Sequence, residues 1–210
     1  MKTIVAATKN KNKIREIEAI TKKFGMEIIS RDEAGVPDIE VEETGKTFEE
    51  NSYLKAYEIM KLCGQITIAD DSGLVVDCLE GAPGVYSARF GTFPGLWPEE
   101  EGSDDGDDTE NNRKLIELIK DVPYEERTAR FVSVITMVYP DGRTITARGE
   151  VEGHVIPETI GDCGFGYDPM FIPEGYEETF GVLSAEIKNS ISHRANALKI
   201  LQEKLEKTVD

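Results

Sequence analysis

The hydrophobic pattern changes period several times in the first third of the chain. Residues 2–7 are an apolar run that predicts a buried strand, residues 8–11 are a polar turn, and apolar side chains then recur at helical spacing over 14–24. Gly25 ends this predicted helix, and residues 26–30 favour a second short strand. A strand, a polar turn and a helix in succession often bind anions, because the first backbone N–H groups of a helix lack partners within the helix.

A second helix is predicted downstream by its capping residues. Thr47 is followed three residues later by Glu50, which is the pattern of a capping box, so a helix is expected over 47–62. Tyr53, Tyr57 and Met60 are spaced to mark its inner face.

Two apolar runs in the middle of the chain are separated by polar and small residues. Residues 65–69 and 74–78 predict strands, and residues 70–73 lie between them as an interruption. Over 91–108 the composition changes abruptly to Gly, Pro, Asp and Glu, which predicts a long, mobile, acidic surface insertion. Thr109 then suits the N-cap of the next helix, which is expected to end near residue 120.

The last part of the chain predicts a hairpin and a closing helix. Residues 127–139 and 144–152 have strand patterns, and the Asp-Gly pair between them is typical of a tight hairpin turn. The closing helix begins near Ser192 and carries four apolar side chains inward, Ala195, Leu198, Leu201 and Leu205. Alternating strands and helices followed by a hairpin predict an α/β fold with a mixed sheet, in one domain of residues 1–210. The hairpin also predicts a second lobe or a dimer surface.

The charge balance restricts the classes of partner. Acidic residues number 41 against 24 basic ones, and the formal net charge of -17 repels a polyphosphate backbone, so no nucleic acid partner is expected. A small anionic ligand stays compatible where a few lysines converge and a divalent cation neutralises nearby carboxylates. The three cysteines form no C-x-x-C pair, and no segment approaches the roughly 18 apolar residues of a membrane span, so a cytoplasmic protein with reduced thiols and no membrane association is expected.

The polar turn after the first strand is the first candidate site. It contains Thr8, Lys9, Asn10, Lys11 and Asn12, and Lys13 follows them. Free backbone N–H groups and the helix dipole favour a phosphate there, and Lys13 adds a full positive charge. A solvated lysine-rich turn is an equally open interpretation of this composition.

Two adjacent carboxylates, Asp70 and Asp71, follow the third predicted strand. Neighbouring side chains of an extended segment point to opposite faces, so one carboxylate can hold a metal ion or a water while the other packs or braces the first. Glu42, Glu43, Asn51 and Lys55 could supply further polar groups, and Glu42 with Asp71 suffices for Mg2+, which keeps water and phosphate among its ligands. A structural turn made of Asp, Ser and Gly is the alternative.

Two later segments carry groups suited to a nucleobase. Residues 164–171 place aromatic side chains between glycines and beside an Asp, which suits stacking on a base and hydrogen bonding to its edge or sugar. Residues 190–195 join a hydroxyl cap to His193 and Arg194, which are donors for a carbonyl oxygen or a phosphate, and Lys188 comes just before them. An aromatic core strand with a bulge and a structural histidine stay open as alternatives.

Six motifs occur in order along the chain: T-x-N-x-x-K at 8–13, E-E-T-G-x-T-F-x-E-N-x-x-x-K-A at 42–56, A-D-D-S-G-L at 69–74, G-A-P-G-V-Y-S-A-R at 81–89, G-F-G-Y-D-P-x-F at 164–171 and I-S-H-R-A at 191–195. Together they closely resemble the inosine triphosphate pyrophosphatase family, also called XTP/dITP diphosphatases, over nearly the whole chain. The segment between Arg89 and Thr109 departs from the family pattern because it is longer and acidic, and it contains no site motif.

The resemblance implies an elongated, two-lobed α/β fold around a long mixed sheet flanked by helices, with the active site in the cleft between the lobes. It also implies a homodimer and Mg2+-dependent hydrolysis of ITP, dITP and XTP to the monophosphate and pyrophosphate. Asp71 is the implied base and metal ligand, Glu42 shares the metal, Lys13 and Lys55 assist at the triphosphate, and Phe165 stacks on the purine. The candidate substrate-binding residues are Thr8, Lys9, Asn10, Lys11, Asn12, Lys13, Ser72, Phe165, Gly166, Tyr167, Asp168, Lys188, His193 and Arg194.

Two other functions stay open at this point. One is a pyrophosphatase of standard or modified nucleotides, as in the related Maf-like proteins. The other is a nucleotide-sensing module that binds without turnover. A panel of triphosphates assayed for pyrophosphate release separates all three.

Overall fold

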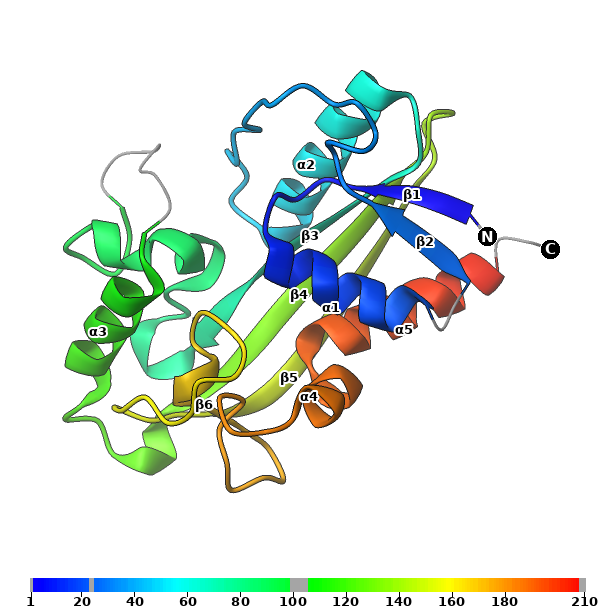
Figure 1. Cartoon of the computed structure of the whole chain (residues 1–210). Coiled ribbons are helices and arrows are strands. Elements are labelled where there is room, and N and C mark those ends of the chain that lie inside the picture. Colours follow the sequence, from blue (N-terminus) through cyan, green and yellow to red (C-terminus); the bar gives the residue numbers. More distant parts are fainter. Residues whose placement is uncertain (1, 23–24, 99–105, 208–210) are drawn as a thin grey trace. The chain divides into compact units, whose positions relative to one another are not determined.

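The computed structural model of the chain describes residues 2–22, 25–98 and 106–207. Strands β1 and β2 pair in parallel, as do β1 and β3, whereas β5 and β6 pair antiparallel, so the sheet is mixed and the predicted α/β class is confirmed. The sheet has the order β2-β1-β3-β4-β5-β6 (Figure 1). Its strands are β1 (Lys2–Ala6), β2 (Met26–Ile29), β3 (Thr67–Val76), β4 (Thr128–Val138), β5 (Thr144–Val155) and β6 (Phe171–Pro173).

The chain divides into two compact units. Unit 1 comprises Met1–Asp71, Ser133–Gly149 and His193–Asp210, and unit 2 comprises Ser72–Val132 and Glu150–Ser192. The α-helices of the described ranges are α1 (Lys11–Thr21), α2 (Phe48–Cys63), α3 (Asp108–Ile119), α4 (Ala185–Ile191) and α5 (His193–Glu206). None of these helices is both long enough and apolar enough to span a bilayer.

In unit 1, helices α1 and α5 lie side by side (Figure 1). Ile4 of β1, Ile17 of α1 and Leu198 of α5 belong to one buried cluster. This confirms the first predicted strand, the amphipathic helix after it and the inner face of the closing helix. The first helix ends at Thr21, and Phe24, the last position of its predicted apolar face, lies outside the described residues.

The capping box at the start of α2 is confirmed, and the predicted inner face is confirmed at Met60 but wrong at Tyr53. The Thr47 hydroxyl accepts a hydrogen bond from Glu50 N at 3.2 Å, and Glu50 Oε2 accepts one from Thr47 N at 3.2 Å. The buried face carries Ala56, Ile59 and Met60, and Tyr57 packs partly against them, whereas Tyr53, which stacks on Tyr57, is 40% exposed. Packing, rather than aromatic character, decides which side of this helix is buried.

Strand β3 corrects the predicted interruption at residues 70–73. It runs unbroken from Thr67 to Val76, with β1 and β4 as its neighbours. β1 pairs with β3 at Thr67 and Ile68, and the strand continues past this pairing through residues 70–73, so the sheet overrides the turn preference of Asp, Ser and Gly. Asp70 and Asp71 therefore lie in mid-strand rather than at a strand end.

The hairpin of β4 and β5 is confirmed. Tyr139 N donates to Arg143 O at 2.9 Å across the turn, and Gly142 has a φ of 88°, in the left-handed region that glycine adopts most readily.

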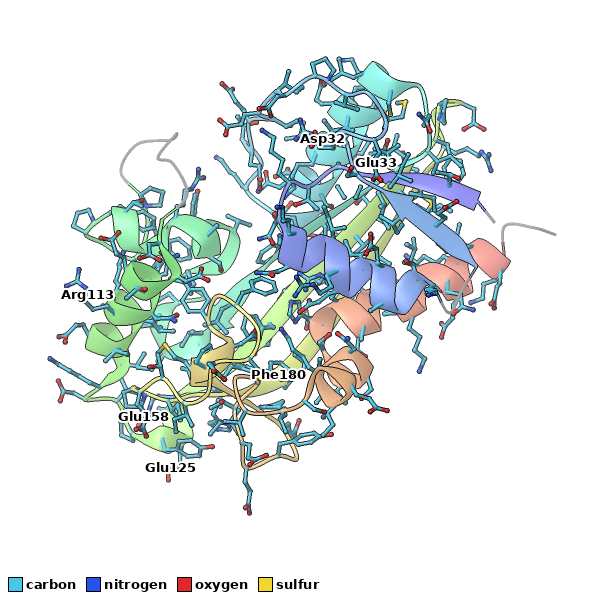
Figure 2. The ribbon with its side chains drawn as sticks, viewed as in Figure 1. Asp32, Glu33, Arg113, Glu125, Glu158 and Phe180 are labelled. Atoms are coloured by element: carbon cyan, nitrogen blue, oxygen red, sulfur yellow. The ribbon has the colours of Figure 1, made fainter. Side chains whose placement is uncertain are left out.

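Unit 2 has its own apolar core, in which Phe180 lies buried, whereas Glu125 and Glu158 point away from the ribbon (Figure 2). The stretch predicted as an insertion is not all surface, because Phe93 packs into this core. Residues 99–105 of that stretch lie outside the described residues.

Two helix boundaries in unit 2 differ from the expectation. Helix α3 begins two residues early because the Asp107 carboxylate, rather than Thr109, is the N-cap and accepts from Thr109 N at 3.2 Å. Helix α4, whose N-cap is Ser184, was not predicted.

Candidate active site

The predicted site residues fall into two groups, one in each unit. In unit 1, the turn between β1 and α1 is shaped by its own side chains. Asn10 Oδ1 accepts hydrogen bonds from Asn12 N at 2.9 Å and Lys13 N at 3.2 Å, and the Thr8 hydroxyl accepts one from Asn10 N at 3.1 Å. This corrects the expectation that these N–H groups are free for a phosphate, because Asn10 caps the helix.

The lysines of this turn differ in their surroundings. Lys9 forms an exposed ion pair with Asp38, and Lys11 is exposed. Lys13 points inward instead, and its Nζ lies 3.2 Å from Asp70 Oδ2, with 16% of its side chain exposed. Only Lys13 among the three is therefore tied to the carboxylates of β3.

Asp70 is the centre of a buried charge network within unit 1. Its Oδ2 accepts a hydrogen bond from Arg194 Nη2 at 2.9 Å, and its Oδ1 accepts one from the Ser133 hydroxyl at 2.5 Å. Arg194 Nη1 also donates to Glu16 of α1. Burial alone raises the pKa of Asp70, but Arg194 and Lys13 outweigh it and hold the pKa well below its usual value.

Arg194 has partners that the sequence did not indicate. It is fully buried and bonds to two carboxylates, so the structure makes it an ion-pair partner of Asp70 and Glu16. Its predicted place at the edge of a base stays a prediction. Nothing in the neighbouring sequence indicates that this charged side chain is buried.

Asp71, the next residue of β3, has fewer partners. Its Oδ1 accepts from Lys55 Nζ at 2.7 Å, and Lys55 Nζ lies 3.1 Å from Glu43 Oε2. Its Oδ2 is buried and has no hydrogen-bond partner in the described part of the chain. Burial, with a contribution from Glu43, raises the pKa of Asp71 to about 6, and Lys55 limits the rise.

The metal site is only partly defined by these side chains. Across residues 2–22, 25–98 and 106–207 there is no group of three or more His, Cys, Asp or Glu side chains that could hold a metal ion. Glu43 belongs to the network of Lys55 and Asp71, and Glu42, the predicted metal ligand, precedes it in the chain; both glutamates are exposed. The unpaired Oδ2 of Asp71 fits a cation whose other ligands are water and phosphate, as Mg2+ prefers.

In unit 2, Phe165 lies in a loop fixed by Asp168. Asp168 Oδ2 accepts from Phe165 N at 2.8 Å and from Lys188 Nζ at 2.6 Å, and both charged side chains are buried. Lys188 Nζ lies 5.0 Å from the centroid of the Phe165 ring, which is half-buried. Gly164 has a φ of 81°, and a Cβ there would collide with the Asp168 carboxylate, so glycine is required.

Tyr167 and Gly166, two predicted site residues of the same segment, form hydrogen bonds that hold it in place. The Tyr167 hydroxyl donates to Ser87 O at 2.8 Å, and the ring is buried in the core of unit 2. Gly166 is bonded through both of its backbone polar groups, its N–H to Asp108 and its carbonyl to Asn112. The Phe165 ring, in contrast to that of Tyr167, is partly open to solvent.

The remaining predicted residues lie next to these groups. Ser72 follows Asp71 in β3 and is half-buried. His193 is the first residue of α5, precedes Arg194 and is buried. Sequence reasoning named Glu43 among the further polar groups, but it did not single out Glu16, Ser133, Asp108 or Asn112, and it left the role of Asp70 open.

Comparison with known proteins gives similarity along the whole chain. The model of the Ham1 family matches residues 4–204, which include every candidate site residue. A dITP/XTP pyrophosphatase of Clostridium perfringens is 44% identical over 98% of this chain and 98% of its own length. One of Desulforamulus reducens is 47% identical over 93% of this chain and 92% of its own length. The solved structure of the Staphylococcus aureus Ham1 protein superposes with a TM-score of 0.81 at 40% identity, covering 99% of this chain and 100% of that one.

Proposed function

The chain belongs to the Ham1 family, and on that premise we propose that it hydrolyses non-standard purine nucleoside triphosphates such as dITP, XTP and ITP. The products are the nucleoside monophosphate and pyrophosphate, so the activity removes these nucleotides from the pool. The observation that carries the proposal is the 44% and 47% identity, over nearly full length, to proteins named dITP/XTP pyrophosphatases.

Asp71 is the proposed base. Its Oδ2 is buried without a partner among the described residues, and a pKa of about 6 leaves the carboxylate mostly ionised at neutral pH yet able to take a proton. The water oxygen attacks phosphorus, the water proton passes to Asp71, and the phosphoanhydride bond to pyrophosphate breaks. Lys55, bonded to Oδ1, fixes the orientation of the carboxylate.

Asp71 and Glu42 are the proposed ligands of Mg2+. The unpaired, buried Oδ2 of Asp71 supports this assignment, and Glu42 is the second carboxylate of the motif. When bound, the ion neutralises charge on the triphosphate and holds its oxygens in place.

The triphosphate is proposed to contact the turn between β1 and α1. Lys13 supplies the charge nearest to the carboxylates of β3, and Lys55 adds a second cation. The exposed side chains of Lys9, Lys11 and Asn12 extend the positive and polar surface of the turn. Thr8 and Asn10 contribute by holding the turn in shape, since their oxygens accept from its backbone.

The base is proposed to stack on Phe165. Lys188 and Asp168 supply a donor and an acceptor beside the ring, and His193 adds a donor. Tyr167 supports this group from a buried position, Gly166 supplies backbone, and Arg194 is proposed as a further donor. Donors aimed at a 6-oxo group are left unpaired or face an amino group when adenine enters, which costs roughly 1–3 kcal/mol for each unsatisfied group.

The test is a steady-state assay of pyrophosphate release from dITP, XTP, GTP, ATP, dTTP and UTP, with and without Mg2+. We expect turnover of dITP and XTP only with Mg2+, and little of ATP or the pyrimidines. Asp71→Asn should abolish the signal, and Asp141→Asn, which changes an exposed carboxylate in the hairpin turn, should leave it unchanged.

The two rival functions give different results in the same assay. Turnover of pyrimidine triphosphates in preference to dITP would identify a pyrophosphatase of the Maf-like kind. Binding of dITP without pyrophosphate release, whether or not Asp71 is changed, would identify a sensing module.

Assembly and location complete the proposal. We propose a homodimer that acts in the cytoplasm, where its nucleotide substrates are made and where its three free cysteines stay reduced. Light scattering of the purified protein tests the dimer, and a mass of one chain would exclude it.

A further inference from the structure

The first turns of helix α3 bond to both backbone polar groups of Gly166. Asp108 Oδ2 accepts a hydrogen bond from Gly166 N at 2.8 Å, and Asn112 Nδ2 donates one to Gly166 O at 3.0 Å. Asp108 and Asn112 are four residues apart, so they lie on the same face of α3. Neither residue belongs to the predicted site.

These two bonds add to the one that Asp168 makes to Phe165 N at 2.8 Å. The loop at Phe165 and Gly166 is thus held at successive backbone groups by three side chains. Asn112 is buried, and its Oδ1 has no hydrogen-bond partner among the described residues. Burying an amide oxygen without a partner costs free energy, so a side chain that is kept there for one hydrogen bond suggests that the position of this bond matters.

The neighbouring residues of the same types have different partners. Asp107 caps α3 through Thr109 N. Asn111 donates to Ala88 O at 3.0 Å and accepts from Gly91 N at 2.6 Å, so it holds a different loop. The chain therefore offers a matched control for each of the two residues.

We infer that Asp108 and Asn112 are positioning residues for base recognition, which hold the Phe165 ring in the orientation that the purine stacks on. The inference rests on the proposed function, because it takes Phe165 as the stacking residue. A loop released from α3 has to be ordered when substrate binds, and this cost appears in KM rather than in the chemical step.

The experiment measures kcat and KM for dITP with Mg2+ in Asp108→Ala and Asn112→Ala, with Asp107→Ala and Asn111→Ala as controls. We expect KM to rise about two- to tenfold in the first pair, more for the buried Asn112, with kcat unchanged. The control pair should keep the wild-type KM. In a Phe165→Ala background, Asp108→Ala and Asn112→Ala should raise KM no further.

Three results would overturn the inference: an unchanged KM in both Asp108→Ala and Asn112→Ala, an equal rise in the control pair, or a rise that persists in the Phe165→Ala background. If Asn112→Ala fails to fold, the comparison of Asp108→Ala with Asp107→Ala decides the question alone. Wild-type protein that releases no pyrophosphate from dITP would instead contradict the proposed function.

Discussion

Asp70 and Asp71 are adjacent in strand β3 and point to opposite faces of it, and the two carboxylates differ in their partners and in the direction of their pKa shifts. Asp70 is 1% exposed and Asp71 5% exposed, so burial does not distinguish them. Asp70 has Ser133, Arg194 and Lys13 as partners, and its pKa is held well below the usual value. Asp71 has one cation, Lys55, on one oxygen and no described partner on the other, and its pKa is raised to about 6. We infer that the number of partners separates a carboxylate that stabilises the fold from one that is available for chemistry.

The contribution of Asp70 to stability is tested by removing Arg194, the cation bonded to its Oδ2, and this change should have the largest effect on stability. Arg194→Met should lower the free energy of unfolding by about 3–5 kcal/mol, because Asp70 and Glu16 lose a buried counterion. Denaturant unfolding measures the loss. Arg148→Met, which breaks the exposed pair with Glu49, is the control and should cost no more than about 1 kcal/mol. Equal losses in the two variants would mean that the buried network is not a main source of stability.

The Asp71 face predicts the acid side of the pH profile. Protonated Asp71 cannot accept a proton, so kcat/KM should fall about tenfold per pH unit below an apparent pKa at or below about 6. A bound cation favours the ionised form and moves this limb to lower pH. Rates between pH 5 and pH 8 at saturating Mg2+ measure it.

Stability should not limit this measurement. The pKa of Asp70 is depressed in the folded state, so its contribution to stability is complete above the usual carboxyl pKa and is lost only as the pH falls below that value. Circular dichroism at pH 5 should therefore report folded protein. A loss of structure together with activity near pH 6 would contradict the assignment of the limb to Asp71.

The smallest expected effect belongs to Glu43. Its charge raises the pKa of Asp71, so Glu43→Gln should move the acid limb to lower pH by less than about one unit and change the rate at neutral pH only slightly. Glu42→Gln is the matched control for the metal, and it should raise the Mg2+ concentration needed for half-maximal activity. If Glu43→Gln raised the Mg2+ requirement and Glu42→Gln did not, Glu43 rather than Glu42 would be the metal ligand.

Local patterns were sufficient to predict much of the fold. The capping box at Thr47 and the hairpin turn before Arg143 depend on residues a few positions apart, and the structure has both. The break expected at Asp70 was wrong, because turn preferences compete with sheet pairing that local sequence does not reveal.

The sequence motifs identified the candidate site residues, but they did not show which of these residues contact one another. Alternation along a strand already indicated that Asp70 and Asp71 face opposite ways. The partner of Asp70, Arg194, is 124 residues away, and Ser133 is 63 residues away, so neither pairing could be derived from spacing. Asp108 lies at the end of an acidic run that suggests solvated side chains, and only the fold brings it to Gly166.

The division between the two carboxylates is tested most directly by comparing pyrophosphate release from dITP, per folded molecule, in Asp70→Asn and Asp71→Asn. We expect Asp71→Asn to remain as stable as wild type and to lose activity by about 10^2- to 10^4-fold, the usual contribution of a general base. Asp70→Asn should lose stability and keep most of its turnover. Substantial turnover in Asp71→Asn, or an equal loss per folded molecule in Asp70→Asn, would contradict the account.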